Sequence, residues 1–280
     1  MKPIVTIFTP TYNRAHLLTR LYHSLIIQTN KSFEWLIVDD GSTDETKNLI
    51  NQFLSENLIS IKYYRQINGG KHTAINKGVE LAKGDLFFIV DSDDYLPENS
   101  IEKIIFYYEK IKNISSIASI TGKRYITNDL KKNIEFHKKE FESNFFDIRY
   151  KYNYNGDMAE VVKTSVMKEF PFPVFNDEKF CTEAVVWNRI SKKYNCLFID
   201  EFIYNCEYQE GGLTSVYSKL LLNNPNSSLL YYRELLKFPL NNEQRKIVAR
   251  LYNGIAKIKG YSKFKVLSKI GIINFVKIYL

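Results

Sequence analysis

The chain has 280 residues, of which 45% are hydrophobic and 15% aromatic, and its formal net charge is +8. This length fits one large domain, or one domain with an appendage. No apolar run reaches the roughly 18 residues that a membrane span needs.

The positive charge is concentrated at the C-terminal end of the chain. From Gln244 to Leu280 there are nine Lys or Arg and no acid, so residues 1–243 carry a net charge of −1. A near-neutral body argues against a nucleic-acid-binding core, and we expect no nucleic-acid partner.

Cysteine usage indicates the compartment. The three cysteines, Cys181, Cys196 and Cys206, are odd in number and show no C-x-x-C spacing. They predict reduced thiols rather than a disulfide framework or a zinc site. The chain also opens on a strand-like run instead of a charged-then-apolar leader, so we expect a cytoplasmic protein.

The first hundred residues alternate between strand-like and helix-like patterns. Strands are predicted over 3–9, 34–40, 58–64 and 85–91, and helices over 14–28, 41–54, 71–84 and 96–111. In this reading Gly84 marks the end of the third helix, and Pro97 lies in the first turn of the fourth. Such alternation predicts a mostly parallel, doubly wound sheet of the Rossmann-like kind.

Beyond about Lys112 the pattern becomes mixed. Strands are predicted over 115–122, 159–163 and 196–208, a helix over 182–194, and a helical remainder from about Tyr217. The sequence therefore divides into segments 1–111, 112–215 and 216–280.

Polar clusters follow three of the predicted strands. Pro10, Thr11, Tyr12 and Asn13 follow the first, Asp39 and Asp40 end the second, and Asp91, Ser92, Asp93 and Asp94 end the fourth. Ligands bind beyond the carboxyl ends of strands in such sheets, so we expect these clusters to converge on one edge.

The DSDD stretch at 91–94 has two explanations. Hard divalent ions such as Mg²⁺ or Mn²⁺ prefer oxygen ligands and often take only one or two carboxylates. Alternatively, Asp93 or Asp94 caps the helix that follows. The second acidic pair, at Asp39 and Asp40, favours the metal site. Because side chains alternate along a strand, we expect one acid of that pair to point inward and the other toward a ligand.

Phosphate binding by a glycine loop is not supported, because neither G-x-G-x-x-G nor G-x-x-x-x-G-K-[ST] occurs. Lys71 and His72 follow Gly69 and Gly70 at a predicted helix start, where backbone N–H groups meet anions well. A flexible turn with a solvated lysine explains the same residues.

Taken together, FTPTYNR, IVDDGSTDET, NGGKHTAINKG and AKGDLFFIVDSDD resemble the family 2 glycosyltransferases of the GT-A fold. The match covers roughly residues 3–110 and continues more weakly to about 215. It implies an inverting enzyme that uses a nucleotide-activated sugar, UDP-linked, with Mn²⁺ or Mg²⁺. It further implies a nucleotide-sugar-binding half (1–111), an acceptor-binding and catalytic half (112–215) and a basic helical extension (216–280).

The resemblance also implies roles for single residues. Those implied for the nucleotide are Pro10, Thr11, Tyr12, Asn13, Asp40, Lys71, His72, Asp91 and Ser92. Asp93 is implied as the metal ligand, with Asp91 near the metal or its water. Asp94, Asp157, Thr182 and Gln209 are candidates for contacts with the donor or acceptor sugar.

The catalytic base is predicted from the stretch CTEAVVWNRI. In the family an Asp from a Glu-Asp pair precedes a W-x-R-like helix. Aligning Trp187 and Arg189 places Thr182 on that Glu and Glu183 on that Asp. Glu183 is therefore the candidate base, although it also suits the first turn of its own helix.

The basic tail mixes lysines with apolar residues. It reads either as an amphipathic segment on an anionic inner membrane face or as a helix with a solvated basic face. Membrane contact would suit a lipid-linked saccharide or growing glycan as the acceptor. Two other functions stay open: a sugar nucleotidyltransferase, and a catalytically degenerate subunit that serves as a binding or scaffolding partner.

Overall fold

The computed structural model describes residues 2–154, 156–207 and 216–279. These residues fall into two compact units. Unit 1 comprises 1–171 and 189–209, and unit 2 comprises 172–188 and 210–280.

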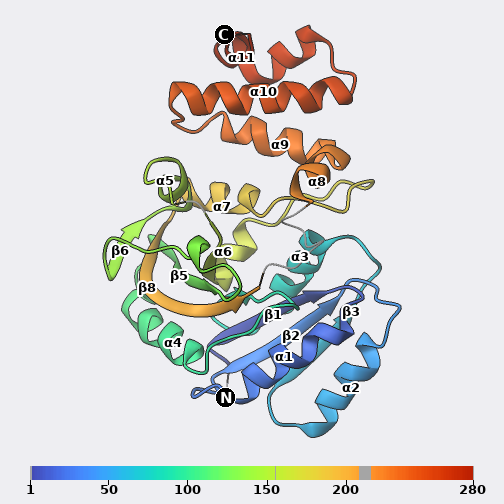
Figure 1. The fold of residues 1–280 in the computed structure, drawn as a ribbon, viewed down its shortest axis with the longest axis vertical. Coiled ribbons are helices and arrows are strands. Elements are labelled where there is room, and N and C mark those ends of the chain that lie inside the picture. Colours follow the sequence, from blue (N-terminus) through green and yellow to red (C-terminus); the bar gives the residue numbers. More distant parts are fainter. Residues whose placement is uncertain (1, 155, 208–215, 280) are drawn as a thin grey trace. The chain divides into compact units, whose positions relative to one another are not determined.

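Unit 1 contains one sheet whose strands run in the order β3-β2-β1-β4-β7-β5-β8-β6 (Figure 1). The strands are β1 (Val5–Thr11), β2 (Phe33–Asp39), β3 (Ile61–Arg65), β4 (Leu86–Ile89), β5 (Ile117–Ile126), β6 (Glu140–Ser143), β7 (Met158–Lys163) and β8 (Asn195–Cys206).

The helices of unit 1 are α1 (Ala15–Ile26), α2 (Thr46–Glu56), α3 (Lys71–Leu81), α4 (Ser100–Ile111), the 3₁₀ turn η1 (Leu130–Lys132), α5 (Phe145–Tyr150) and α6 (Thr164–Glu169). Helix α7 (Ala184–Ser191) begins in unit 2 and ends in unit 1. The helices of unit 2 are α8 (Tyr217–Asn223), α9 (Pro225–Leu235), α10 (Asn242–Ile258) and α11 (Lys263–Lys277).

The first four strands are parallel, as predicted. Strand β1 lies between β2 and β4, and β2 pairs with β3. The register sets Thr11 beside Asp39 and Phe8 beside Ile89. The carboxyl ends of β1, β2 and β4 therefore share one edge, and the polar clusters that follow them converge there. Strand β7 then joins antiparallel to β4 and β5, which makes the second half of the sheet mixed.

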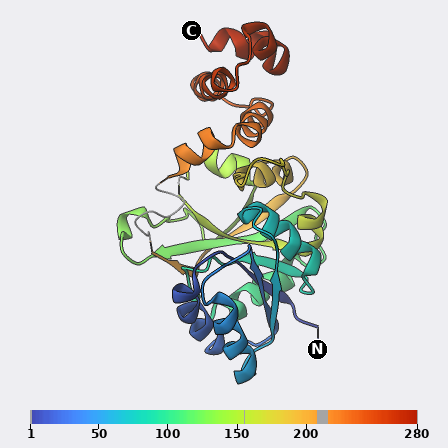
Figure 2. The same cartoon turned by 90° about the vertical axis from the view of Figure 1, so that its right-hand side faces the viewer.

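Helices cover both faces of the sheet because neighbouring strand residues point to opposite sides. Ile7 belongs to a core cluster with Leu21 of α1, Phe53 of α2 and Ile104 of α4. Phe8 points the other way, against α3, where a Cβ added at Gly78 would lie 2.2 Å from the Phe8 ring. Figure 2 shows helices on both sides of the sheet.

Pro97 and Gly84, which were predicted to mark helix ends, have other roles. Helix α4 begins at Ser100, so Pro97 precedes the helix and does not lie in its first turn. Helix α3 ends at Leu81, before Gly84. A Cβ on Gly84 would lie 2.4 Å from the Thr6 backbone nitrogen, so this glycine permits a close approach of backbones.

Three short elements had no clear sequence pattern. Strand β6 has four residues, and α5 and α6 have six each, too few for a periodic signal. In unit 2, α10 packs against α9 and α11. In the part of the chain that the structure describes, no helix has both the length and the apolar character required to cross a membrane.

Replacing Gly78 by Ala tests the packing of α3 on Phe8. Alanine favours a helix, but here its methyl group would overlap a fully buried ring. We expect the free energy of unfolding to fall by about 1–3 kcal/mol in urea titrations. Gly254→Ala in α10 is the matched control, because a Cβ there has open space. It should raise stability by up to ~1 kcal/mol. Equal effects of the two changes would contradict the packing described.

Candidate functional site

Asp40, just beyond β2, is buried and holds the turn that precedes α3. Its Oδ1 accepts hydrogen bonds from the Gly69 N–H (2.9 Å) and from Gln66 Nε2 (2.8 Å). Its Oδ2 accepts from the Gly70 N–H (2.7 Å) and from Asn68 Nδ2 (3.1 Å). A carboxylate offers about four lone-pair sites, so all of them are used.

Asp39 is also buried and bound within the protein. It accepts from the Ser42 N–H (2.7 Å) and from the Tyr63 hydroxyl (2.6 Å). Both acids of the pair are thus bound within the protein in this structure, and a ligand-facing role for Asp40 stays a prediction. The turn at 69–70 folds back over Asp40 and supplies the donors that a ligand was expected to supply.

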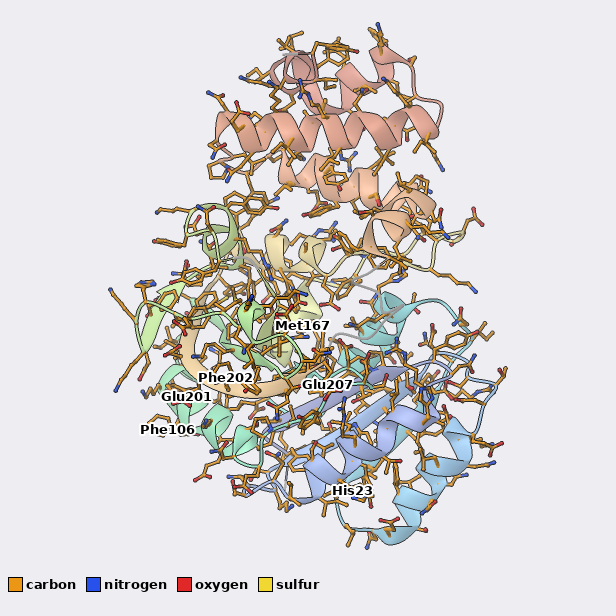
Figure 3. All side chains as sticks on the ribbon, in the orientation of Figure 1. His23, Phe106, Met167, Glu201, Phe202 and Glu207 are labelled. Atoms are coloured by element: carbon orange, nitrogen blue, oxygen red, sulfur yellow. The ribbon has the colours of Figure 1, made fainter. Side chains whose placement is uncertain are left out.

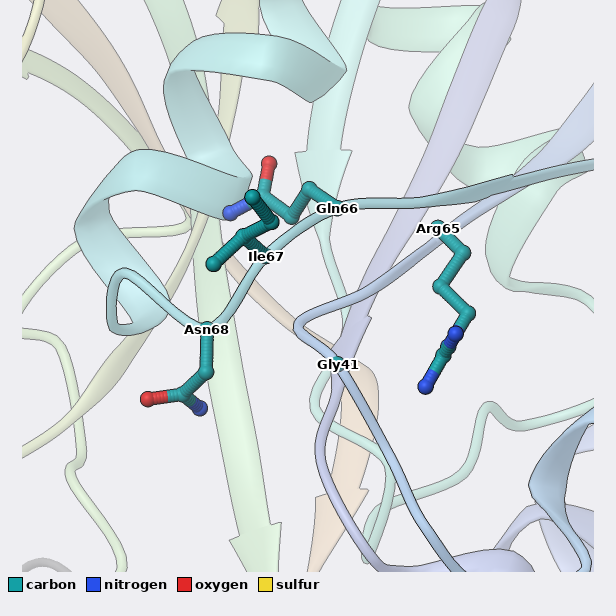
Figure 4. A pocket seen from close by; sticks show the side chains of 5 residues that line it. All are labelled: Gly41, Arg65, Gln66, Ile67 and Asn68. Carbon is teal, nitrogen blue, oxygen red and sulfur yellow. The ribbon is translucent and has the colours of Figure 1, made fainter.

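A cavity of about 410 Å³ lies beside this turn (Figure 4). Its lining consists of Gly41, Arg65, Gln66, Ile67 and Asn68. Gln66 and Asn68 thus face both the cavity and Asp40, so the carboxylate fixes part of the cavity wall.

The first predicted cluster lies at the end of β1, which includes Pro10 and Thr11, and in the turn that follows it. Asn13 adopts a left-handed conformation (φ 53°), and its Oδ1 accepts from the Thr43 N–H (2.7 Å), which joins this turn to the one after β2. Tyr12 is 48% exposed and presents its ring to solvent. Thr11 is buried, and its Oγ1 has no hydrogen-bond partner among the described residues. An orphaned hydroxyl of this kind suits a ligand contact.

Two acids of the DSDD stretch form ion pairs. Lys71 Nζ lies 2.8 Å from Asp91 Oδ1, and Arg14 Nη1 lies 2.8 Å from Asp93 Oδ2. Both carboxylates remain reachable from solvent, with side-chain exposures of 25% for Asp91 and 17% for Asp93. Neither Asp93 nor Asp94 caps α4, whose N-cap residue is Asn99 and makes no side-chain cap bond. The helix-cap explanation of DSDD is therefore wrong.

The third acid, Asp94, is buried against β8. The Tyr204 hydroxyl donates to Asp94 Oδ2 (2.6 Å) and accepts from the Asp91 N–H (3.0 Å). The Arg124 guanidinium lies 4.3 Å from the centre of the Tyr204 ring, and its Nε donates to the Met158 carbonyl (2.8 Å). The Tyr204 hydroxyl thus connects the Asp94 carboxyl to the backbone N–H of Asp91.

Burial and charge move the pKa values of two of these acids in opposite directions. Burial raises the pKa of Asp91, but Lys71, Arg124 and Arg14 outweigh it and hold the pKa below its ordinary value. Burial, followed by the charge of Asp91, raises the pKa of Asp94 to about 7. Close carboxylates resist simultaneous ionisation, and the better-paired one keeps the charge.

Strand β8 fixes the loop that contains DSDD from the side. Tyr95 and Asn205 exchange backbone hydrogen bonds of 3.1 and 2.8 Å. Arg20 of α1 donates to the Asp93 carbonyl and pairs with Glu207 (2.9 Å), which Figure 3 labels. Residues more than a hundred positions apart thus hold one short loop.

The other predicted residues are distributed over both units. Pro10 lies in β1 beside Val38 of β2, and His72 and Ser92 are buried in unit 1. Asp157 is exposed just before β7, and its charge contributes to raising the pKa of Arg124. Gln209 lies outside the described residues.

The candidate base belongs to unit 2. The Glu183 carbonyl accepts from the Val186 and Trp187 N–H groups at the start of α7, and its side chain is half-buried. Thr182 Oγ1 lies 3.0 Å from the Tyr217 hydroxyl. The role of Glu183 stays a prediction.

Four residues of the site were not predicted: Arg124, Tyr204, Gln66 and Asn68. Arg124 gave only a weak signal, because it stands beside Lys123 in SITGKRYI, just beyond the strand predicted over 115–122. Tyr204 gave none, since a tyrosine in a strand is ordinary.

Comparison with known proteins identifies the family to which the chain belongs. A model of the family described as glycosyl transferase family 2 matches residues 6–172, more than half of the chain. The chain belongs to glycosyl transferase family 2. It is 33% identical over 104 residues to glycosyltransferase GlyG of Streptococcus pneumoniae. That match covers 37% of this chain and only 35% of GlyG, so the chain resembles about a third of that relative.

Solved structures share the GT-A fold of the family 2 chain. A fragment of S. aureus TarS in complex with UDP-GlcNAc aligns with a TM-score of 0.64 at 20% identity, over 99% of this chain and 78% of the fragment. The mannosyltransferase PcManGT from Pyrobaculum calidifontis, in complex with GDP-Man and Mn²⁺, aligns with a TM-score of 0.57 at 14% identity, over 99% and 74%. These likenesses confirm the predicted fold class.

The buried carboxyl of Asp94, whose pKa burial and the charge of Asp91 raise, predicts a defined pH dependence of stability. The folded state keeps the Asp94 proton up to about pH 7, whereas an ordinary carboxyl releases it near pH 3.8. The folded state therefore binds more protons over this range, and the free energy of unfolding should fall as pH rises from about 4 to 7. Asp94→Asn should flatten that slope in urea titrations at several pH values.

Tyr204→Phe should instead cost about 1–3 kcal/mol at pH 8, because it leaves the buried Asp94 carboxylate and the partly buried Asp91 N–H without their partner. Tyr125→Phe on the neighbouring strand β5 is the control, because that ring is partly exposed. An unchanged slope in Asp94→Asn would show that this acid does not titrate as described.

Proposed function

We propose that the chain is an inverting glycosyltransferase. It would move a sugar from a nucleoside-diphosphate donor, UDP-linked, to a growing surface glycan or a lipid-linked saccharide. The observation that carries the proposal is the convergence of Asp91, Asp93, Lys71 and Arg14 on one sheet edge. Membership of glycosyl transferase family 2 and the UDP-GlcNAc complex of TarS support it.

The base of the donor would lie near the turn after β1. Tyr12 offers an exposed ring for stacking, and Thr11 Oγ1 a hydroxyl that needs a partner. Asp40 would accept an imide N–H only by releasing one of its four donors, and the Asn68 amide makes the longest of those bonds. The cavity beside Asn68 would then take part of the nucleotide.

A divalent cation fits Asp91 and Asp93 if phosphates of the substrate supply further ligands. Among the described residues no group of three or more acidic, His or Cys side chains is placed to hold a metal ion. Two carboxylates do meet the need of Mg²⁺ or Mn²⁺ when substrate phosphates complete the shell. When bound, the cation would neutralise charge on the leaving diphosphate. The Mn²⁺ complex of PcManGT supports this proposal.

The two ion pairs of Asp91 and Asp93 suggest how the protein would accommodate the charge of the cation and the diphosphate. Lys71 and Arg14 now neutralise Asp91 and Asp93. In the donor complex both basic side chains would turn from the carboxylates to the diphosphate oxygens, where Lys and Arg bind well. We assign Asp94 to supporting this loop through Tyr204, and Asp157 and Thr182 to contacts with sugars. Gln209 stays a predicted sugar contact.

Glu183 would remove the proton of the acceptor hydroxyl as that oxygen attacks the anomeric carbon. Inversion needs such a base, and general-base catalysis contributes about 10²–10⁴-fold. Two alternatives remain. A sugar nucleotidyltransferase would be expected to have a glycine-rich basic loop after β1, where this chain has Tyr12, Asn13 and Arg14. A non-catalytic subunit would bind nucleotide without turnover.

The donor site is tested by thermal unfolding with UDP, GDP, CDP and dTDP, each with and without Mn²⁺. Binding to the folded state raises the midpoint. We expect a rise of several degrees with UDP that requires Mn²⁺ and disappears in Asp93→Ala. Asp129→Ala, which changes an acid that pairs with nearby Lys132 (3.0 Å), is the control. No rise with any nucleotide would refute the proposed site.

Glu183→Gln tests the proposed base. The change keeps the size of the side chain but removes its basicity, so kcat with a UDP-sugar should fall by about 10²–10⁴-fold while the UDP-induced stabilisation is unchanged. Glu243→Gln, at an exposed position of α10, should leave kcat unchanged. Full turnover in Glu183→Gln would mean that another group is the base.

A further inference from the structure

Helix α10 presents apolar residues to solvent as well as to its neighbours. Its buried side consists of Val248, Ala249, Tyr252, Ile255 and Ala256. A different side carries Ile247, Leu251 and Ile258, of which Ile258 is 64% exposed. At 3.6 residues per turn these three fall within about 40° of one another around the helix. They form a stripe that no described helix covers.

Helix α11 continues the pattern on both sides of a bend. Gly271 adopts φ 78° and ψ 163° inside it, a conformation that glycine permits and that divides the helix in two. Val266 and Ile270 are buried, whereas Phe264 is 79% exposed. Beyond the bend the exposed apolar residues are Ile272, Ile273, Val276 and Tyr279.

Side-chain hydrogen bonds tie the bent part of α11 to α10. Arg245 Nη1 donates to Asn274 Oδ1 (2.9 Å), and Arg250 Nε donates to the Ile278 carbonyl (3.3 Å). The two helices therefore form one packed pair, and the apolar residues listed above are exposed on a folded surface, not on a loose tail.

Exposed basic residues lie on the same two helices and the turn between them, and the stretch 244–280 contains no acid. Of the nine Lys and Arg between Gln244 and Leu280, six are exposed. They are Arg250, Lys257, Lys259, Lys263, Lys265 and Lys269. We call these six, with the exposed apolar residues of α10 and α11, the basic–apolar surface.

We propose that the basic–apolar surface binds the face of an anionic phospholipid bilayer. Such binding combines burial of apolar side chains at the headgroup boundary with attraction of Lys and Arg to acidic lipids. Both ingredients are present on one helix pair, and no described helix is long and apolar enough to span the membrane. The chain would lie on the bilayer.

The same features disfavour other occupants. A second copy of the chain would bring two sets of six cations together, and like charges in contact repel. A nucleic acid would match the cations but would leave Ile247, Ile272 and Ile273 without an apolar partner, because nucleic acids are bound through phosphates and stacked bases. Of these three occupants, the lipid surface is the one that offers negative charge and apolar depth together.

The test is sedimentation of the full chain with vesicles. We expect binding to vesicles of phosphatidylcholine with 30% phosphatidylglycerol, little binding to phosphatidylcholine alone, and weaker binding at high salt. Lys263→Gln, Lys265→Gln and Lys269→Gln combined should weaken binding on the order of 100-fold. Phe264→Ser, Ile272→Ser and Ile273→Ser combined should also release the protein.

Matched controls lie in unit 1. Lys131, Lys138 and Lys139, all exposed, are changed to Gln together, and the exposed Leu58 is changed to Ser. Both controls should bind vesicles like the parent chain, and circular dichroism should show all variants folded. No binding to acidic vesicles, or equal loss in the controls, would overturn the proposal. Concentration-dependent dimers abolished by the apolar triple change would also overturn it, in favour of a second copy.

Discussion

The mutual repulsion of Asp91, Asp93 and Asp94 is the constraint around which unit 1 is organised. Three acids in four residues at the end of a buried strand are tolerated only if other groups compensate them. The compensation comes from all over the unit: Arg14 from the turn before α1, Lys71 from the start of α3, and Tyr204 from β8. Each of these groups also holds a loop in place. The contacts that compensate the charge of the three acids therefore also position the loops at the carboxyl edge of the sheet.

The first half of the fold was predictable because its signals are local. Alternating β-branched runs and amphipathic segments identify the strands and helices up to α4, and parallel order follows from the connections. That the polar clusters meet follows in turn, since parallel strands share a carboxyl edge. The second half was harder. Strand β6 and helices α5 and α6 are too short for a periodic signal. The antiparallel pairing of β7 with β4 and β5 is set by contacts that only the assembled sheet provides.

The site divides in the same way. Asp91, Asp93 and Lys71 stand in recognisable motifs, and their proximity was expected. The partners of Asp40 were not, because a buried carboxylate saturated by Gly69, Gly70 and two amides looks the same in sequence as one that awaits a ligand. Arg124 and Tyr204 were missed because their roles arise from contacts distant in sequence, which for Tyr204 and Asp94 are 110 residues apart.

The dependence of the DSDD loop on β8 has a consequence for how the protein reaches its folded state. Strands β1 to β4 and their helices form a compact set of contacts close in sequence, which can form early during synthesis. The Tyr204 hydroxyl and the Asn205 backbone are about 110 residues further along. Until they arrive, the loop lacks its lateral support and the buried acid its donor. The carboxyl edge of the sheet can therefore adopt its final structure only when almost all of unit 1 has been synthesised. A partly synthesised chain would lack the complete site.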